Sequence, residues 1–288
     1  MLFRSGMPDY FLTAHYPTGL EDDFTVVWWE QRGFGISFDP ESDPGCLNTE
    51  QMLSDIKSLT DSLRTRFGQE KIYLMGRSGG TYTGIQAAAR YPECFHAYIG
   101  IGQMTDQLES EKQAYTFMLQ RYREAGNIRW VKRLEAVPVV ETIPAAYLKL
   151  RDPAMHSLGI GTTRTMRSVA RELFLPSLTF REYTLREKIR FWRAKARYGV
   201  HPLWEEILRT SMIQKVNHLE IPVYFLHGRY DYTVSYSLAR EYYEALEAPV
   251  KAFFTFENSA HSPHMEEPQK TREILRTHIL KQNPAGLQ

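Results

Sequence analysis

Residues 71–84 read KIYLMGRSGGTYTG, and this stretch decides the fold. A short apolar run, 72–75, is followed by a serine, Ser78, that lies among three glycines. The residues after it have helical composition, and Pro92 stops that helix. A G-x-S-x-G pattern is weak by itself, but between a strand and a helix it directs the serine hydroxyl beyond the carboxyl end of a sheet. We therefore predict that Ser78 is a nucleophile, and the structural alternative is an ordinary turn.

Further segments have the length and composition of buried strands. They are residues 25–29, 97–101, 223–226 and the aromatic-rich 252–256. Their apolar runs are continuous, which is typical of parallel strands with helices on both faces. Helical periodicity separates them, at 49–67, 80–91 and 237–247. This alternation predicts an α/β fold with a doubly wound, mostly parallel sheet.

Residues 106–213 contain no convincing strand and many helix formers. We predict that they form a helical cap, or lid, domain inserted between two strands of the sheet. The core would then consist of residues 1–105 and 214–288. The charged residues of the insertion are typical of a solvated helical surface, while an insertion of this size over the sheet can also cover a binding site.

The composition excludes several classes of protein. The 288 residues carry a net charge of +1, so the chain has no basic field for nucleic acid. The two cysteines, Cys46 and Cys94, are too few for a disulfide framework. No stretch reaches the roughly 18 apolar residues of a membrane helix, and the first residues do not resemble a signal peptide. We expect a cytoplasmic protein with no membrane or nucleic-acid partner.

A serine hydroxyl needs a base, and the base needs a group that orients it. Asp231 follows the run 223–226, and His261 follows the last predicted strand. The order Ser78, Asp231, His261 is the nucleophile–acid–base order of the α/β hydrolases. His264 is an alternative base, and Asp231 could instead cap a turn or helix. No His-Glu-x-x-His or paired Cys-x-x-Cys spacing is present, so we expect neither a metal nor a cofactor.

Four motifs resemble the α/β-hydrolase superfamily, and specifically its proline iminopeptidase branch. They are WWEQRGFGIS (28–37), GRSGG (76–80), GRYDYTVS (228–235) and SAHSPHMEEP (259–268). The first is similar to the D-Q-R-G-x-G-x-S loop of that branch, with Glu30 in place of the aspartate. The resemblance implies a helical cap and hydrolysis of an ester or amide, in a small molecule or short peptide, by Ser78, His261 and Asp231. The histidine before Ser-Pro in the last motif matches the catalytic one.

The beginning of the sequence departs from this pattern. Members of the branch carry H-G-G-P-G after their third strand, and a backbone N–H of that motif supplies half of the oxyanion hole. Here residues 1–11 read MLFRSGMPDYF, in which Gly6 alone matches the end of the motif. In the family the third strand lies between the strands that correspond to 25–29 and 71–75. We therefore expect two strand edges without a partner in the middle of the sheet, a costly arrangement.

Three outcomes would resolve that gap. The strands 25–29 and 71–75 could pair directly. Another chain, through self-association, or the short segment Leu2-Phe3-Arg4 could fill it. Finally, the complete protein could be longer, which is the outcome we favour.

The resemblance leaves the backbone N–H of Gly79 as an oxyanion donor. Losing one such donor typically costs roughly 100- to 1,000-fold in rate, so we expect weak or no activity. Arg77 and Arg32 are candidate substrate contacts, with a structural role in its loop as the alternative for Arg32. The alternative functions are a small-ester esterase and a non-catalytic remnant or binding protein. Carboxylates that could hold a substrate amine, or simply be surface charges, are Glu109, Glu135, Glu141, Glu172, Glu182 and Glu205.

Overall fold

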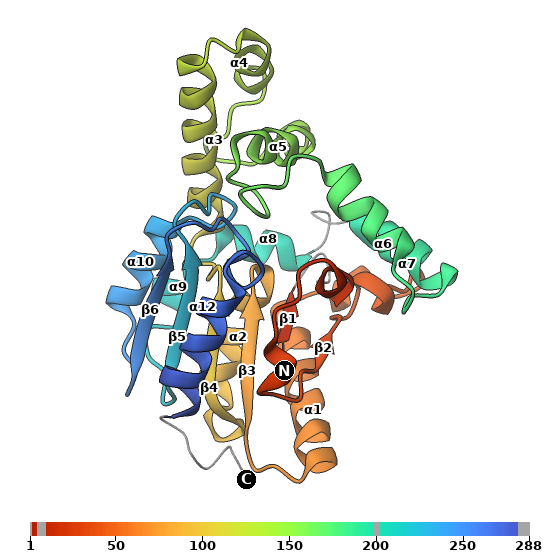
Figure 1. The fold of residues 1–288 in the computed structure, drawn as a ribbon, viewed down its shortest axis with the longest axis vertical. Coiled ribbons are helices and arrows are strands. Elements are labelled where there is room, and N and C mark those ends of the chain that lie inside the picture. Colours follow the sequence, from red (N-terminus) through yellow and green to blue (C-terminus); the bar gives the residue numbers. More distant parts are fainter. Residues whose placement is uncertain (1, 5–9, 198–201, 282–288) are drawn as a thin grey trace.

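The computed structural model describes residues 2–4, 10–197 and 202–281. Its centre is a six-stranded sheet with the order β2-β1-β3-β4-β5-β6, in which each neighbouring pair is parallel (Figure 1). The strands are β1 (Leu2–Arg4), β2 (Trp28–Trp29), β3 (Ile72–Arg77), β4 (Phe95–Ile101), β5 (Val223–Gly228) and β6 (Lys251–Phe256). The predicted α/β class with a parallel sheet is confirmed.

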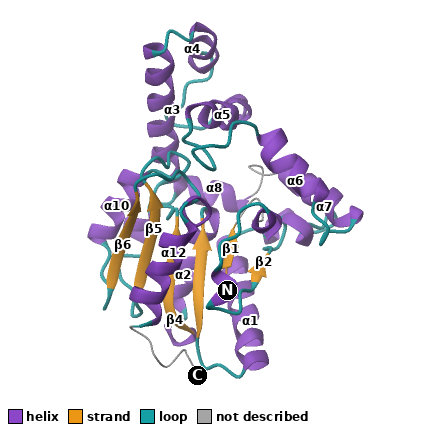
Figure 2. Cartoon of the chain, in the orientation of Figure 1, coloured by secondary structure: helices purple, strands orange, loops and turns teal. Residues whose placement is uncertain are grey.

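Helices cover both faces of the sheet (Figure 2). On one face, Leu74, Tyr98 and Phe225 share a core with α1 (Thr49–Phe67), α2 (Gly79–Arg90) and α10 (Tyr236–Ala245). On the other face, Met75, Ile99 and Tyr224 pack against α12 (Pro268–Ile274) and the π-helical turn η7 (Leu275–Leu280). Successive residues of a strand therefore enter opposite cores, which explains why the strand sequences are apolar without alternation.

Local signals fix the bounds of α1. The side chain of Asn48 accepts a hydrogen bond from the backbone N–H of Gln51, which caps the amino end of the helix. Gly68 ends the helix in the left-handed conformation, with φ 63°. Between these residues Met52 and Ile56 are buried one turn apart. The helix therefore occupies the residues that the periodicity predicted.

The middle of the sheet differs from the sequence expectation. β1 lies between β2 and β3, and Leu2 is paired with Trp28 on one side and with Met75 on the other. Of the outcomes considered, the structure has the one in which Leu2-Phe3-Arg4 fills the gap, so the expectation that both edges lack a partner is wrong at these positions. Self-association through strand edges stays a prediction.

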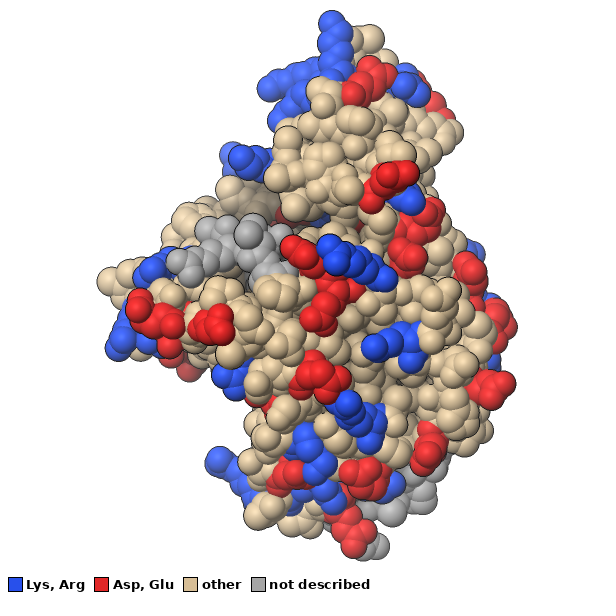
Figure 3. Space-filling view, turned by 180° about the vertical axis from the view of Figure 1, so that it is seen from behind, with Lys and Arg blue, Asp and Glu red and all other residues tan. Residues whose placement is uncertain are grey.

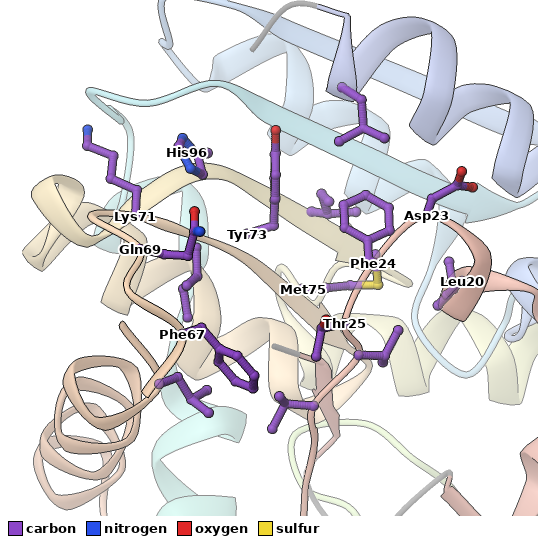
Figure 4. Close-up of a pocket in the computed structure, with 16 residues that line it drawn as sticks. Leu20, Asp23, Phe24, Thr25, Phe67, Gln69, Lys71, Tyr73, Met75 and His96 are labelled. Atoms are coloured by element: carbon purple, nitrogen blue, oxygen red, sulfur yellow. The ribbon is translucent and has the colours of Figure 1, made fainter. Parts of the chain in front are cut away.

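β2 is shorter than the predicted strand 25–29, and its two residues are in register with Leu2 and Phe3 of β1. The segment just before β2, residues 25–27, lines a cavity of about 320 Å³ instead of continuing the strand. Figure 4 shows this cavity, which Phe24 and Thr25 line together with Tyr73 and Met75 of β3. The sheet is therefore paired at the end that carries Ser78 and hollow toward the opposite end.

A helical insertion separates β4 from β5. Its helices are α3 (Gln107–Glu124), α4 (Ile128–Glu135), α5 (Ala145–Leu158), α6 (Leu175–Thr179), α7 (Leu185–Arg197), α8 (Pro202–Arg209) and α9 (Met212–Lys215). α3 to α5 share a small core of their own that includes Met118, Leu134 and Tyr147. Figure 1 shows these three helices beyond the carboxyl ends of the strands. The insertion therefore stands over the edge of the sheet from which Ser78 emerges.

Charged side chains of both signs are interspersed on the molecular face drawn in Figure 3. Among the described residues, no helix is both long and apolar enough to cross a membrane.

Candidate active site

Ser78 lies in a sharp bend between β3 and α2. Its backbone has φ 53° and ψ −127°, and among the described residues it is the one non-glycine residue with a positive φ. A Cβ atom on Gly76 would lie 2.9 Å from the carbonyl oxygen of Gly80, so only glycine lets the strand and the helix approach this closely. A strained conformation that persists in a packed fold is typical of functional sites.

Hydrogen bonds hold the backbone of Ser78 on both sides. Its N–H donates to the carbonyl oxygen of Ile101 at the end of β4, over 2.9 Å. Its own carbonyl accepts from the backbone N–H of Thr81 at 2.8 Å and from the Thr81 hydroxyl at 2.5 Å. Gly79 is the first residue of α2, where backbone N–H groups have no partner within the helix and the helix dipole is positive. This end of α2 therefore suits a developing negative charge.

Asp231 and His261 form a buried pair. Asp231 lies in the loop after β5 and His261 in the loop after β6, and Nδ1 of the imidazole is 2.8 Å from Oδ2 of the carboxylate. Both side chains are at most 1% exposed. An ionised carboxylate only accepts hydrogen bonds, so Nδ1 carries a proton, and in the neutral imidazole the lone pair is on Nε2. The ring is thus in the tautomer that a general base requires.

The carboxylate of Asp231 receives further donors. Oδ1 accepts from the backbone N–H groups of Thr233 and Val234, each at 2.9 Å. The second imidazole at this carboxylate belongs to His227, whose Nε2 is 3.2 Å from Oδ2. Burial opposes ionisation, but the attraction of His261 and the hydrogen bonds from both histidines outweigh it, so the pKa of Asp231 lies well below its usual range. The motifs of the sequence did not identify His227.

Two glycines allow these loops to meet. Gly102 follows β4 with φ 60°, and a Cβ there would lie 3.1 Å from the ring of His261. Since the N–H of Ser78 is bonded to Ile101, both Ser78 and His261 lie against this end of β4. A Cβ on Gly228, at the end of β5, would lie 1.9 Å from the carbonyl oxygen of Ala260. The sequence marks both sites with a glycine at or near the end of an apolar run.

The loop that carries His261 and Ser262, called the histidine loop below, is hydrogen-bonded to the helical insertion. The backbone N–H of His261 donates to the carbonyl oxygen of Gly161 at 3.2 Å. The hydroxyl of Ser262 donates to the carbonyl oxygen of Thr162 at 2.6 Å. The insertion therefore contributes to the position of the imidazole, beyond any role in covering the site.

Glu266 makes a second link between the histidine loop and the insertion. Its Oε1 accepts from the backbone N–H of Arg164 in the insertion at 2.6 Å, and its Oε2 from the N–H of Ala260 at 2.8 Å. Burial raises the pKa of Glu266 to about 7, against the lowering effect of these two hydrogen bonds. The carboxyl group next to the histidine loop thus changes its charge near neutral pH.

The two predicted arginine contacts take other positions. The guanidinium of Arg77 is fully buried, and its Nη2 donates to the hydroxyl of Ser262 at 2.6 Å. This contact ties the serine bend to the histidine loop and differs from the substrate contact that we expected. Arg32 makes two hydrogen bonds to Asp55 on α1, at 2.7 and 2.8 Å, as the structural alternative for this residue predicts.

Glu30, the residue that departs from the family motif, is also a structural link. It accepts hydrogen bonds from the backbone N–H of Ile36 and from the hydroxyl of Tyr183 in the insertion. Burial raises its pKa, although both hydrogen bonds oppose this. Gly6, the one match to the oxyanion motif, lies outside the described residues.

The sequence matches the family model described as the alpha/beta hydrolase fold over residues 6–268. The chain belongs to the α/β-hydrolase family. This agrees with the sheet, the strained serine between strand and helix, and the resemblance stated from the motifs.

Relatives of this α/β hydrolase include peptidases. A probable aminopeptidase, YbaC of Bacillus subtilis, is 30% identical over 275 residues, covering 95% of this chain and 85% of the relative. The proline iminopeptidase of Saccharolobus solfataricus is 23% identical over 266 residues, covering 88% and 75%. The crystal structure of the proline iminopeptidase of Mycobacterium smegmatis has a TM-score of 0.65 at 16% identity, over 99% of this chain and 90% of that one. The chain is a hydrolase of this fold.

Proposed function

We propose that this hydrolase cleaves an ester or amide through Ser78, His261 and Asp231. The observation that carries the proposal is the 2.8 Å hydrogen bond between His261 Nδ1 and Asp231 Oδ2, next to a strained serine at the amino end of a helix. The bond fixes the tautomer of the imidazole, and the strain of Ser78 is of the kind found in nucleophiles on strand-to-helix bends.

The groups would act in two half-reactions. The Oγ of Ser78 attacks the carbonyl carbon while Nε2 of His261 takes its proton, and the oxyanion faces the N–H of Gly79. Collapse of the tetrahedral intermediate breaks the ester or amide bond, and His261 gives the proton to the leaving alcohol or amine. A water molecule, deprotonated by His261, then attacks the acyl group and releases the acid. Asp231 stays ionised throughout and stabilises the imidazolium.

An aminopeptidase is the form of this activity that the named relatives support. A peptidase of this kind must hold a free amine, which calls for a carboxylate near the site. Among the glutamates considered from the sequence, three are in ion pairs within the insertion, namely Glu109 with Lys112, Glu135 with Arg123 and Glu205 with Arg209. These three contacts favour surface roles.

Hydrolysis assays with the purified protein test the proposal. Prolyl-naphthylamide and a short acyl nitrophenyl ester are given to the wild type and to Ser78→Ala. We expect cleavage of at least one substrate by the wild type and loss of that cleavage in the variant. The better substrate separates the peptidase from the esterase. Equal cleavage by both proteins would remove Ser78 from the proposed role.

The second candidate is a hydrolase-like protein that binds a ligand with little or no turnover, because residues 2–6 read Leu-Phe-Arg-Ser-Gly where the resemblance places the oxyanion motif His-Gly-Gly-Pro-Gly. A protein of that kind would bind without cleaving either substrate.

A further inference from the structure

His227 lies in β5 and is completely buried. Its Nε2 is 3.2 Å from Oδ2 of Asp231 and 3.1 Å from the carbonyl oxygen of Val234. The mechanism proposed above makes no use of it. Its ring nevertheless touches the same carboxylate oxygen that binds His261.

The hydrogen-bond partners determine the tautomer of His227. The carbonyl of Val234 and the carboxylate of Asp231 only accept, so Nε2 carries a proton. Nδ1 is buried, and within residues 2–4, 10–197 and 202–281 it has no hydrogen-bond partner. A proton on Nδ1 would bury a charged N–H group without an acceptor, which is costly. His227 therefore donates from Nε2.

Packing holds this ring independently of Asp231. It stacks on Phe253, with ring centroids 6.0 Å apart and planes 9° from parallel. The edge of Tyr236 meets it at 5.8 Å and 84°. The backbone of His227 is in register with Thr255 of β6. The donor is thus a fixed part of the sheet, whereas Asp231 and His261 lie in loops.

We propose that His227 is a positioning residue, whose Nε2–H fixes the carboxylate of Asp231 and moderates its attraction for the proton of His261. This inference rests on the proposed serine-hydrolase function. The Nε2–H of His227, hydrogen-bonded to the carbonyl of Val234, also lies 3.2 Å from Oδ2, so it weakens the bond that His261 makes to this oxygen. Burying Nδ1 of His227 without a hydrogen-bond partner among the described residues costs free energy. A buried polar group in this state calls for an explanation, and a role at the site supplies one.

The consequence is a shift in the proton affinity of His261. Without the donor at position 227, Oδ2 of Asp231 carries more negative charge and holds the imidazolium of His261 more strongly. One hydrogen bond of ordinary strength corresponds to a rise of about half to one pH unit in the pKa of His261. The other titratable or charged residues around Asp231 and His261 are not substituted in any of the variants. They are Arg77, Glu111, Arg151, His156, Arg164, His264 and Glu266.

The test is a titration by NMR of the full chain with ¹⁵N-labelled histidine, between pH 5 and 9. In the wild type we expect Nε2 of His227 to carry a proton. His227→Phe keeps a ring against Phe253 but removes the donor, and we expect the pKa of His261 to rise by about half to one unit. His227→Gln is the matched control, because its amide nitrogen reaches the place of Nε2 and donates from there. We expect it to titrate like the wild type.

Each alternative result overturns the inference. A wild-type spectrum in which Nε2 of His227 carries no proton is incompatible with the inference even if no variant folds. An unchanged His261 in His227→Phe would reduce His227 to a packing residue, and so would equal shifts in both variants. The pH dependence of Ser78 labelling by a fluorophosphonate is measured in parallel. Absence of labelling in the wild type would count against the proposed function alone, since the titration does not depend on it.

Discussion

The imidazole of His261 and the carboxylate of Asp231 are 30 residues apart in the sequence and meet at 2.8 Å in a buried site. Two loops that follow neighbouring strands, β5 and β6, bring them together. The contact orients a base only if the carboxylate keeps its charge. Three hydrogen-bond donors surround it, with Nε2 of His227 at 3.2 Å from Oδ2, and together they leave no position for an amide N–H₂ group.

Asp231→Asn tests this pair. The amide would present N–H groups to donors and would favour the wrong tautomer of His261. We expect the rate of hydrolysis, or of Ser78 labelling, to fall by roughly 1,000- to 10,000-fold, as in serine hydrolases that lose this charge. Asp61→Asn, on the exposed side of α1, is the control and keeps the wild-type rate. A loss of less than tenfold in Asp231→Asn would mean that Asp231 does not orient the base.

Gly228→Ala tests the approach of the two loops. The new Cβ would lie 1.9 Å from the carbonyl oxygen of Ala260, which is backbone and has to move. We expect a loss of about 2–3 kcal/mol in the free energy of unfolding, with a fall of roughly 5–10 °C in Tm. Gly45→Ala is the control, since its Cβ meets only the exposed side chain of Asp43 at 3.2 Å. A Gly228→Ala protein as stable as this control would show that the loops are not so closely packed.

The raised pKa of Glu266 implies that the stability of the folded state depends on pH in a specific way. Its pKa is raised by burial to about 7 in the folded state, above the 4.5 of a free side chain. A raised pKa stabilises the fold fully below the unfolded value, and this contribution is lost as the pH rises through the folded value. At pH 5 we expect Glu266→Gln to have a lower Tm than the wild type, because the amide can accept only one of the two backbone hydrogen bonds that Glu266 accepts. By pH 8 we expect this difference in Tm to be smaller, because the wild type has then lost the contribution of the protonated carboxyl group. Thermal unfolding at several pH values measures it.

Glu50→Gln, an exposed site on α1, is the control and should give a difference that does not vary with pH. A gap between the wild type and Glu266→Gln that widens toward pH 8 would contradict the assignment of a raised pKa to Glu266.

Periodicity predicted the helices well, because their signals are local. α1 occupies Thr49–Phe67 as predicted, because its caps at Asn48 and Gly68 and its apolar face all depend on residues close together in the sequence. Strand bounds depend on the neighbouring strand, and the sequence carries no such signal. Residues 25–27 have strand composition, but the strand β2 comprises only Trp28 and Trp29, which are paired with Leu2 and Phe3 of β1.

Site residues were predictable where chemistry and motif agree, and Asp231 and His261 form the contact that their order suggested. The supporting residues were not predicted, because their roles depend on tertiary contacts. His227 reads as one more residue of a buried strand, and Glu266 as one more acidic residue of a loop. Arg77 reads as an exposed cation next to the nucleophile, yet it is buried against Ser262. A glycine after an apolar run, as at Gly102 and Gly228, was the signal that could have marked the meeting of these loops.

The most direct measurement of the central claim is the identification, by peptide mass spectrometry, of the residue that a fluorophosphonate modifies. We predict one modified serine, Ser78, with no labelling in Ser78→Ala and wild-type labelling in Ser62→Ala, a serine on the surface of α1. Circular dichroism establishes that each variant is folded. Modification of another serine, or labelling that persists in folded Ser78→Ala, would contradict the account.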